Sequence, residues 1–204
     1  MNFKTIIKKS AIKNHSRNRK NRLIPPASDN MVIEILKKNN IKPKSVLEIG
    51  CSTGYILEKI RLLFKSKCYG VDISSTAISE GRKLFKKLKL ENNFFEDSLF
   101  NKKKYDVIIC GFFLFMMPLD KILNFFSKVD ASLNLNSYII INDFVNLKFI
   151  KKKYKHDKGL FVYRWDYKKL LLSMPNYKLC GVIKRYRPVV KDFEEVAIIK
   201  KIKV

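Results

Sequence analysis

The segment VLEIGCSTG, residues 46–54, holds the side chains of this sequence that are best suited to bind a charged ligand. The apolar run from Ser45 to Ile49 is typical of a buried parallel strand, and helical spacing begins at Tyr55. The two glycines at positions 50 and 54 allow a ligand to approach the backbone closely between these elements. Glu48 adds a carboxylate at the end of the strand, which suits a ligand that carries an amino group or a sulfonium.

The glycine pattern of this turn differs from the phosphate-binding fingerprint of dinucleotide enzymes. That fingerprint requires three glycines spaced G-x-G-x-x-G, whereas this turn has G-x-x-x-G with Ser52 at the middle position. A dinucleotide is therefore disfavoured. Turns of this kind also occur in ordinary strand-to-helix packing, so the turn alone does not identify a function.

Three segments, VLEIGCSTGYILEKI, CYGVDIS and YDVIICGFFLFMMP, follow one another in an order and spacing that a known family shares. The chain resembles the class I S-adenosylmethionine-dependent methyltransferases, including those classed as methyltransferase types 11 and 12, from about Met31 to Phe144. The resemblance implies an enzyme that binds S-adenosylmethionine and transfers its methyl group to an acceptor.

The resemblance also implies roles for individual residues. Asp72, twenty-two residues after Gly50, would hydrogen-bond the ribose hydroxyls, and Ile73 would lie against the adenine. Asp97 would accept a hydrogen bond from the adenine amino group, and Phe112 would face the sulfonium through cation–π attraction. The residues expected to bind the cofactor are Glu48, Gly50, Cys51, Ser52, Gly54, Asp72, Ile73, Asp97, Ser98, Gly111 and Phe112.

Helical and strand patterns alternate along most of the chain, which predicts a parallel sheet with helices on both faces and ligands at the carboxyl ends of the strands. The expected fold is α/β, a Rossmann-like three-layer sandwich with a seven-stranded, mostly parallel sheet and one antiparallel C-terminal strand. The expected helices are 31–38, 55–64, 75–88, 119–133 and 167–174. The expected strands are 45–49, 68–73, 93–96, 105–111, 138–142, 177–186 and 195–202.

The length of 204 residues and a hydrophobic content of 47% predict one domain, residues 28–204, after a basic N-terminal extension, residues 1–27. Ser28 or Asp29 is expected to cap the first helix of that domain. We expect no membrane span, because the longest apolar run, 107–118, is too short, and no secretory signal, so the expected location is the cytoplasm. The four cysteines form no C-x-x-C pair, and we expect no metal site.

The formal net charge of +25 raises the possibility of a nucleic-acid partner. Lysine outnumbers arginine by 35 to 8, whereas bidentate recognition of phosphate and guanine favours arginine. The lysines are also spread over nearly every surface segment. A solvated basic surface is therefore favoured over a nucleic-acid interface.

The stretch 144–165, basic and aromatic without clear periodicity, is expected to form a lid over the acceptor. Asp143, His156 and Asp157 are the candidate general bases, of which Asp143 and His156 are preferred, because a base must lie within hydrogen-bond reach of the acceptor. We expect a small-molecule acceptor for O- or N-methylation, with nucleotide-linked or lipid-linked sugars as candidates and Lys151 to Lys155 or Arg164 binding their phosphates.

Two alternatives remain open. One is an RNA- or ribosome-associated methyltransferase, which the charge supports. The segment Cys110 to Phe113 opposes a target adenine in nucleic acid, because it lacks the [DNS]-P-P-[YFW] signature that positions a flipped base. The other alternative is a non-catalytic partner protein that keeps the fold.

Overall fold

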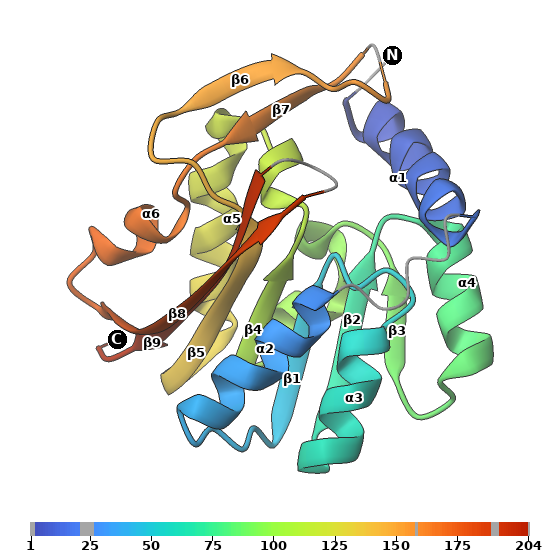
Figure 1. The fold of residues 1–204 in the computed structure, drawn as a ribbon. Helices are drawn as coiled ribbons and strands as arrows, with labels where there is room; N and C mark the ends of the chain where they lie inside the picture. Colours follow the sequence, from blue (N-terminus) through green and yellow to red (C-terminus); the bar gives the residue numbers. More distant parts are fainter. Residues whose placement is uncertain (1–2, 21–26, 158, 189–191, 204) are drawn as a thin grey trace.

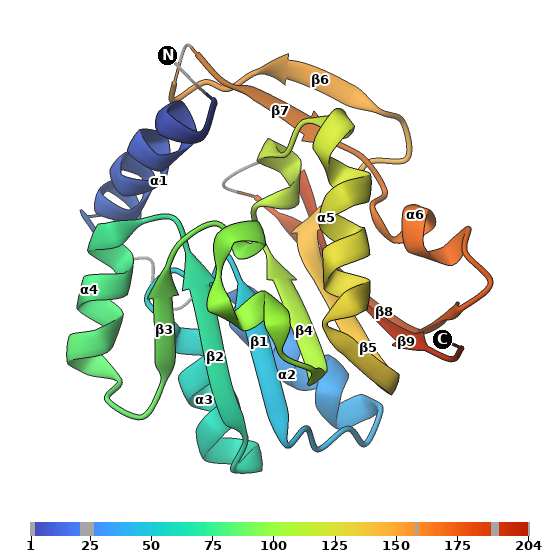
Figure 2. The same cartoon turned by 180° about the vertical axis from the view of Figure 1, so that it is seen from behind.

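The computed structural model describes residues 3–20, 27–157, 159–188 and 192–203 and places a seven-stranded sheet between two layers of helices (Figures 1 and 2). The strand order is β3-β2-β1-β4-β5-β9-β8. The first five strands in this order run parallel, and β9 is antiparallel to both of its neighbours. The predicted fold class is confirmed. The strands of the sheet are β1 (Ser45–Ile49), β2 (Lys67–Asp72), β3 (Lys89–Asn92), β4 (Tyr105–Gly111), β5 (Leu133–Phe144), β8 (Tyr177–Arg187) and β9 (Asp192–Lys201).

Each of the two helical layers is formed by helices that are consecutive in the chain. One layer contains α2, α3 and α4, and α5 and α6 lie on the opposite face (Figures 1 and 2). Two short 3-10 turns, η1 and η2, connect β3 to β4, and a third, η3, precedes α5. The helical elements are α1 (Phe3–Lys20), α2 (Ala27–Lys38), α3 (Tyr55–Phe64), α4 (Ser75–Leu84), η1 (Phe95–Asp97), η2 (Leu99–Lys102), η3 (Leu114–Met116), α5 (Leu119–Ala131) and α6 (Lys168–Leu172).

The central strands are buried on both faces, as parallel strands between helices must be. Successive side chains of a strand point to opposite faces, so each strand contributes to two separate apolar clusters. In β1, Val46 packs in the cluster on the α2 and α3 side, and Leu47 and Ile49 pack in the cluster on the α5 side. This double burial holds the carboxyl ends of β1, β2 and β4 at one edge of the sheet.

The third strand lies earlier in the chain than expected. The predicted strand 93–96 is wrong, since β3 is Lys89–Asn92, and the helix expected to reach residue 88 ends at Leu84. Leu88 and Leu90 are buried and Lys89 between them is exposed. This alternation is typical of a strand. The abundant lysines of the same segment are instead typical of the end of an exposed helix.

Two parts of the chain for which the sequence predicted no helix or strand form regular elements. The lid segment 144–165 contains β6 (Ile150–Lys153) and β7 (Phe161–Arg164), which pair as an antiparallel hairpin. Most of the expected N-terminal extension forms α1, which packs against α4. Helix α2 begins at Ala27, so Ser28 and Asp29 lie inside the helix and the predicted cap is wrong. Within the described residues, no helix is both long enough and apolar enough to cross a lipid bilayer.

Helix α4 packs closely against residues 50–54, here called the glycine turn, and the closest approach is at Gly81. A Cβ atom at this position would lie 2.4 Å from the Thr53 carbonyl oxygen and 2.7 Å from Leu90 Cδ1. Both distances are far below van der Waals contact, and the backbone of the turn cannot move aside cheaply. The absence of a side chain at Gly81 therefore allows the helix and the turn to pack this closely.

We predict that Gly81→Ala lowers the free energy of unfolding by about 1–3 kcal/mol, because overpacking outweighs the gain in helix propensity. Urea unfolding of the purified protein measures this change. Ser79→Ala, at an exposed position of the same helix, is the control and should leave the free energy of unfolding within about 0.5 kcal/mol of the parent. A more stable Gly81→Ala protein would contradict the close packing.

Candidate functional site

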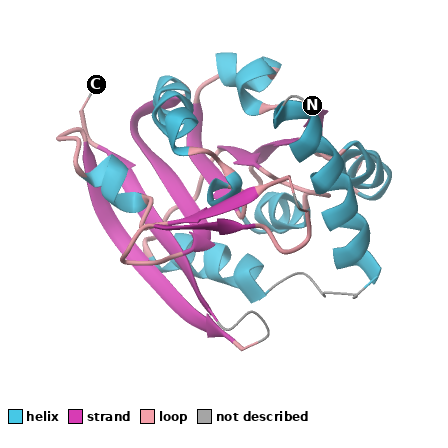
Figure 3. Ribbon diagram, turned by 90° about the horizontal axis from the view of Figure 1, so that it is seen from above, coloured by secondary structure: helices cyan, strands magenta, loops and turns pink. Residues whose placement is uncertain are grey.

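A cavity of about 1180 Å³ lies at the carboxyl ends of β1, β2 and β4. Its floor contains the turn after β1, the end of β2 and the segment after β4. Seen from above, α1 and the β6–β7 hairpin lie over this edge of the sheet (Figure 3). Side chains from both of these elements line the cavity, among them Ile7, Asn14, Lys152, Val162 and Arg164.

The glycine turn has the backbone geometry that close packing at the cavity requires. Gly50 has φ of 76°, and a Cβ atom there would lie 2.8 Å from the Gly111 carbonyl oxygen and 2.9 Å from Phe113 Cδ1. Only glycine fits this position without strain. Ser52 has φ of 51° and lines the cavity beside Gly50.

Asp72 is held at the cavity by two backbone donors from different turns. The Ser52 N–H donates to its Oδ2 at 2.8 Å, and the Ser74 N–H donates to its Oδ1 at 2.7 Å. Burial raises the pKa of this carboxyl, and the two N–H bonds and the nearby His15 oppose that shift. Each carboxylate oxygen can accept more than one hydrogen bond, so Asp72 can also accept from hydroxyl groups of a ligand.

The wall beyond Asp72 is formed by Ile73 and by residues 93–97. Because β3 ends at Asn92, Asn93 and Phe94 come directly after this strand, and Asp97 lies further along the chain. The Asp97 carboxylate, half exposed, pairs with Lys4 of α1 at 2.6 Å, and this hydrogen bond lowers its pKa. Asp97 thus lines the cavity as expected, but it is bound to α1 in this structure.

Four residues that were expected to bind the cofactor are not among those that line the cavity. Glu48 is buried, and its Oε1 lies 3.3 Å from the position that a Cβ of Gly111 would occupy. Burial raises the pKa of the Cys51 thiol far above its usual range. Gly54 begins α3 with φ of 87°, and Ser98 Oγ donates to Glu91 at 2.8 Å. These residues shape the turn and the wall behind the cavity.

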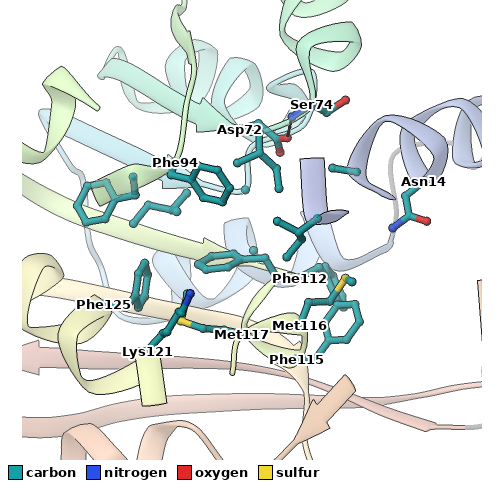
Figure 4. Close-up of a pocket in the computed structure, with 18 of the residues that line it drawn as sticks. Asn14, Asp72, Ser74, Phe94, Phe112, Phe115, Met116, Met117, Lys121 and Phe125 are labelled. Carbon is teal, nitrogen blue, oxygen red and sulfur yellow. Dashed lines mark hydrogen bonds between the residues drawn. The ribbon is translucent and has the colours of Figure 1, made fainter. Parts of the chain in front are cut away.

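The second half of the cavity, beyond Asp72 and the turn after β1, is apolar and mostly aromatic. Phe112, Phe115 and Met116 lie together there (Figure 4). Phe112 follows Gly111 with φ of 51°, and its N–H donates to the Asn142 carbonyl oxygen at 2.8 Å. The Phe112 and Phe115 rings lie 5.3 Å and 5.9 Å from the ring of Phe144. This half of the cavity suits an apolar or aromatic ligand.

Asp143, one of the residues expected to act as a base, is only 3% exposed and is not among the residues that line the cavity. Its carboxylate accepts from the N–H groups of Phe115, at 3.2 Å, and Phe144, at 2.7 Å. Burial raises its pKa to about 7, although these N–H groups and Arg164 favour the ionised form. Through the hydrogen bond with Phe115, Asp143 holds in place residues 112–116, here called the aromatic segment.

The hairpin contributes His156 and Arg164 to the cavity. His156 is exposed and lies edge-on to Tyr154, with 5.3 Å between ring centroids. The Arg164 guanidinium lies 5.1 Å from the centroid of the Phe144 ring and forms an ion pair with Asp192. Its Nε is buried and has no hydrogen-bond partner in the described part of the chain.

Helix α1 supplies several residues of the site that the sequence did not predict. Ile7, Ala11, Asn14 and His15 line the cavity and recur at the spacing of one helical face. The His15 ring lies 3.0 Å from Glu80 of α4, and the Tyr154 hydroxyl donates to Asn14 at 3.1 Å. The signal was present in the sequence as a weakly apolar face, but seven basic residues in 3–20 obscured it.

The residues of the site can act on a ligand through side-chain contacts and through its alignment. Across the described ranges, no group of three or more His, Cys, Asp and Glu side chains is placed to hold a metal ion. What the cavity offers instead is one half with a carboxylate and exposed turn backbone, and one half with aromatic rings and cationic groups.

Solved structures with the same fold include several methyltransferases. The chain matches a 1,6-didemethyltoxoflavin-N1-methyltransferase from Burkholderia thailandensis, solved with S-adenosylhomocysteine, with a TM-score of 0.79, 12% identity and coverage of 98% of this chain and 88% of that chain. It matches the N-methyltransferase NodS from Bradyrhizobium japonicum, also with S-adenosylhomocysteine, with a TM-score of 0.70, 11% identity and coverage of 95% and 99%. The plantazolicin methyltransferase BpumL matches with a TM-score of 0.65, 17% identity and coverage of 98% and 96%.

No curated protein matches the sequence. Residues 41–176, two thirds of the chain, match the methyltransferase domain family. This range contains the glycine turn, Asp72 and the aromatic segment after β4. The chain therefore belongs to the class I S-adenosylmethionine-dependent methyltransferase family.

Proposed function

We propose that the protein binds S-adenosylmethionine and methylates a small molecule that carries an anionic group. The observation that carries this proposal is a cavity with two different halves, one beside Asp72 and the glycine turn and one beside Phe112. The first half suits the hydroxyls and the amino group of the cofactor. The second half would receive the acceptor at the point where the aromatic segment meets the turn.

The residues of the chain would act mainly by alignment. S-Adenosylmethionine supplies an electrophilic methyl group, and the transfer is an in-line displacement that depends on the position of the two reactants. Asp72 and Ser52 would fix the ribose end. The Phe112 ring, held by the hydrogen bond of its N–H to Asn142, would face the sulfonium, and α1 and the hairpin would limit the entry of water.

The acceptor half of the cavity favours a compact anionic molecule over a folded RNA. Arg164 is partly buried beside the Phe144 ring, and its Nε lacks a partner within the described residues. A buried donor of this kind gains a hydrogen bond when a carboxylate or phosphate enters. Lys152 lies in the same wall and would add to the attraction. Nucleotide-linked and lipid-linked sugars remain candidate acceptors.

His156 is better placed than Asp143 to act as the base. It lines the cavity, whereas Asp143 is enclosed behind it. We infer that Asp143 acts as a positioning residue for Phe115 and Phe144 and that His156 would receive a proton if the acceptor needs a base.

We predict that Asp72→Ala weakens the binding of S-adenosylhomocysteine at least about tenfold, because hydrogen bonds to a charged acceptor are lost. Asp106→Ala is the matched control. Its carboxylate also accepts two backbone N–H groups, from Lys44 at 2.8 Å and Ser45 at 3.0 Å, but it lies at the opposite end of the sheet from the cavity. Isothermal titration calorimetry measures both dissociation constants. Equal affinities of the two variants would contradict the site, and a parent protein that does not bind would favour the non-catalytic partner.

We predict that Arg164→Gln reduces a preference for anionic acceptors by at least about tenfold in kcat/KM and leaves the affinity for S-adenosylhomocysteine unchanged. The assay pairs aromatic hydroxy acids with their methyl esters and sugar phosphates with the free sugars, using labelled S-adenosylmethionine. Arg185→Gln is the control, because Arg185 forms a surface ion pair with Glu34 away from the cavity. A parent enzyme that uses charged and neutral members equally well would contradict the role of Arg164.

We predict a pH dependence of stability from Asp143. Its pKa is raised to about 7 in the folded protein, so the folded state retains a proton that the unfolded chain releases near pH 4. The associated stability is fully present below about pH 4 and is lost as the pH rises to about 7, by at most about 4 kcal/mol. Urea unfolding between these pH values should show a smaller decrease for Asp143→Asn than for the parent. Asp120→Asn, at an exposed position, should keep the decrease of the parent, and an unchanged decrease in Asp143→Asn would contradict the raised pKa.

A further inference from the structure

The positive charge of the chain is concentrated in the two segments that cover the cavity. Helix α1, residues 3–20, and the lid segment, residues 144–165, contain 14 of the 43 basic residues and one of the 18 acidic residues. These 40 residues therefore carry 13 of the 25 net positive charges.

The hairpin and the residues directly before it also expose large apolar side chains. Leu147 is 74% exposed, Phe149 is 45% exposed and Phe161 is 39% exposed. Lys148 and Lys151, which do not line the cavity, are exposed among them. In the pairing of the two strands, Lys151 lies opposite Tyr163, and Lys153 lies opposite Phe161. The hairpin thus presents apolar and cationic groups together, at the edge of the molecule that also carries α1 (Figure 1).

The arrangement of the rings distinguishes between two anionic partners. The rings of Phe149 and Tyr163 stack on each other, with centroids 6.5 Å apart. Lys151 Nζ lies 4.8 Å from the centroid of the Phe161 ring and 5.8 Å from that of the Tyr163 ring. Platforms that bind single-stranded RNA leave ring faces open for bases. Here each of these rings has one of its faces in contact with another side chain. A strongly exposed leucine, Leu147, belongs to the same segment.

We propose that this hairpin face binds the surface of a membrane that contains anionic lipids. Leu147, Phe149 and Phe161 would enter the boundary between head groups and acyl chains, and the lysines would pair with lipid phosphates. The charge complementarity of the basic surface with an anionic bilayer supports this partner. The lysine excess supports it as well, since lysine is a point charge that needs no planar bidentate partner.

The position of the hairpin connects this surface to the cavity. Side chains on the other face of the same hairpin, Lys152, Val162 and Arg164, line the cavity. A bound membrane would therefore be separated from the acceptor half of the cavity by the β6–β7 hairpin. The docking itself requires no methyl transfer, so its failure and the failure of the proposed function are observed in separate experiments.

Sedimentation with lipid vesicles tests the proposal. The full chain should sediment with vesicles of phosphatidylcholine mixed with phosphatidylglycerol, should remain in solution with phosphatidylcholine alone, and should be released by high salt. Replacing Leu147, Phe149 and Phe161 together with Ser should weaken binding at least about tenfold. The control is the replacement of Leu62 and Leu63 of α3 with Ser, since these side chains are 63% and 53% exposed on another face.

A charge variant provides a second comparison. Replacing Lys148 and Lys151 with Gln should weaken binding at least about tenfold, whereas the same change at Lys37 and Lys38 should have a small effect. Calorimetry with S-adenosylhomocysteine shows whether each variant remains folded and competent. Equal losses in the two lysine variants would overturn the proposal. It would also be overturned by a serine variant that binds vesicles normally, or by a single-stranded RNA that displaces the vesicles.

Discussion

The cofactor half of the site depends on one carboxylate that accepts hydrogen bonds from two backbone turns. Asp72 ends β2, and its two oxygens bind the N–H of Ser52, in the turn after β1, and the N–H of Ser74, at the start of α4. Burial raises the free energy of the charged form. The two donors offset part of this cost, and the same hydrogen bonds fix the backbone conformation of both turns.

The remaining structure keeps these turns close to each other and to the aromatic segment. Gly50 lies against the carbonyl oxygen of Gly111, and Gly81 lies against that of Thr53, so these segments pack at distances that a side chain would prevent. Behind the aromatic segment, Asp143 accepts the N–H of Phe115. Buried carboxylates thus organise both halves of the cavity, each through backbone donors, and interiors packed in this way transmit small displacements.

The fold and the floor of the site were predictable from the sequence because their signals are local. Continuous apolar runs, such as residues 105–111, predict buried strands, and the glycine turn and Asp72 lie at the ends of such runs. The covering elements were not predictable in the same way. Helix α1 has few apolar residues, and the lysines of residues 150–153 conceal the alternation of a hairpin. Their structure depends on distant partners, such as the hydrogen bond between Tyr154 and Asn14.

The assembly of the cover from two remote segments has a consequence for the synthesis of the protein. Helix α1 is made early, but its contact with Glu80 spans 65 residues and its hydrogen bond with Tyr154 spans 140. At roughly 5–20 residues per second, Tyr154 follows Asn14 on the order of ten seconds later. During that interval Ile6 lacks its neighbour Gly159, which connects the two strands of the hairpin. In a nascent chain, the residues at the carboxyl ends of β1, β2 and β4 would therefore be exposed before the β6–β7 hairpin covers them. Chaperones would encounter α1 before it docks against the hairpin.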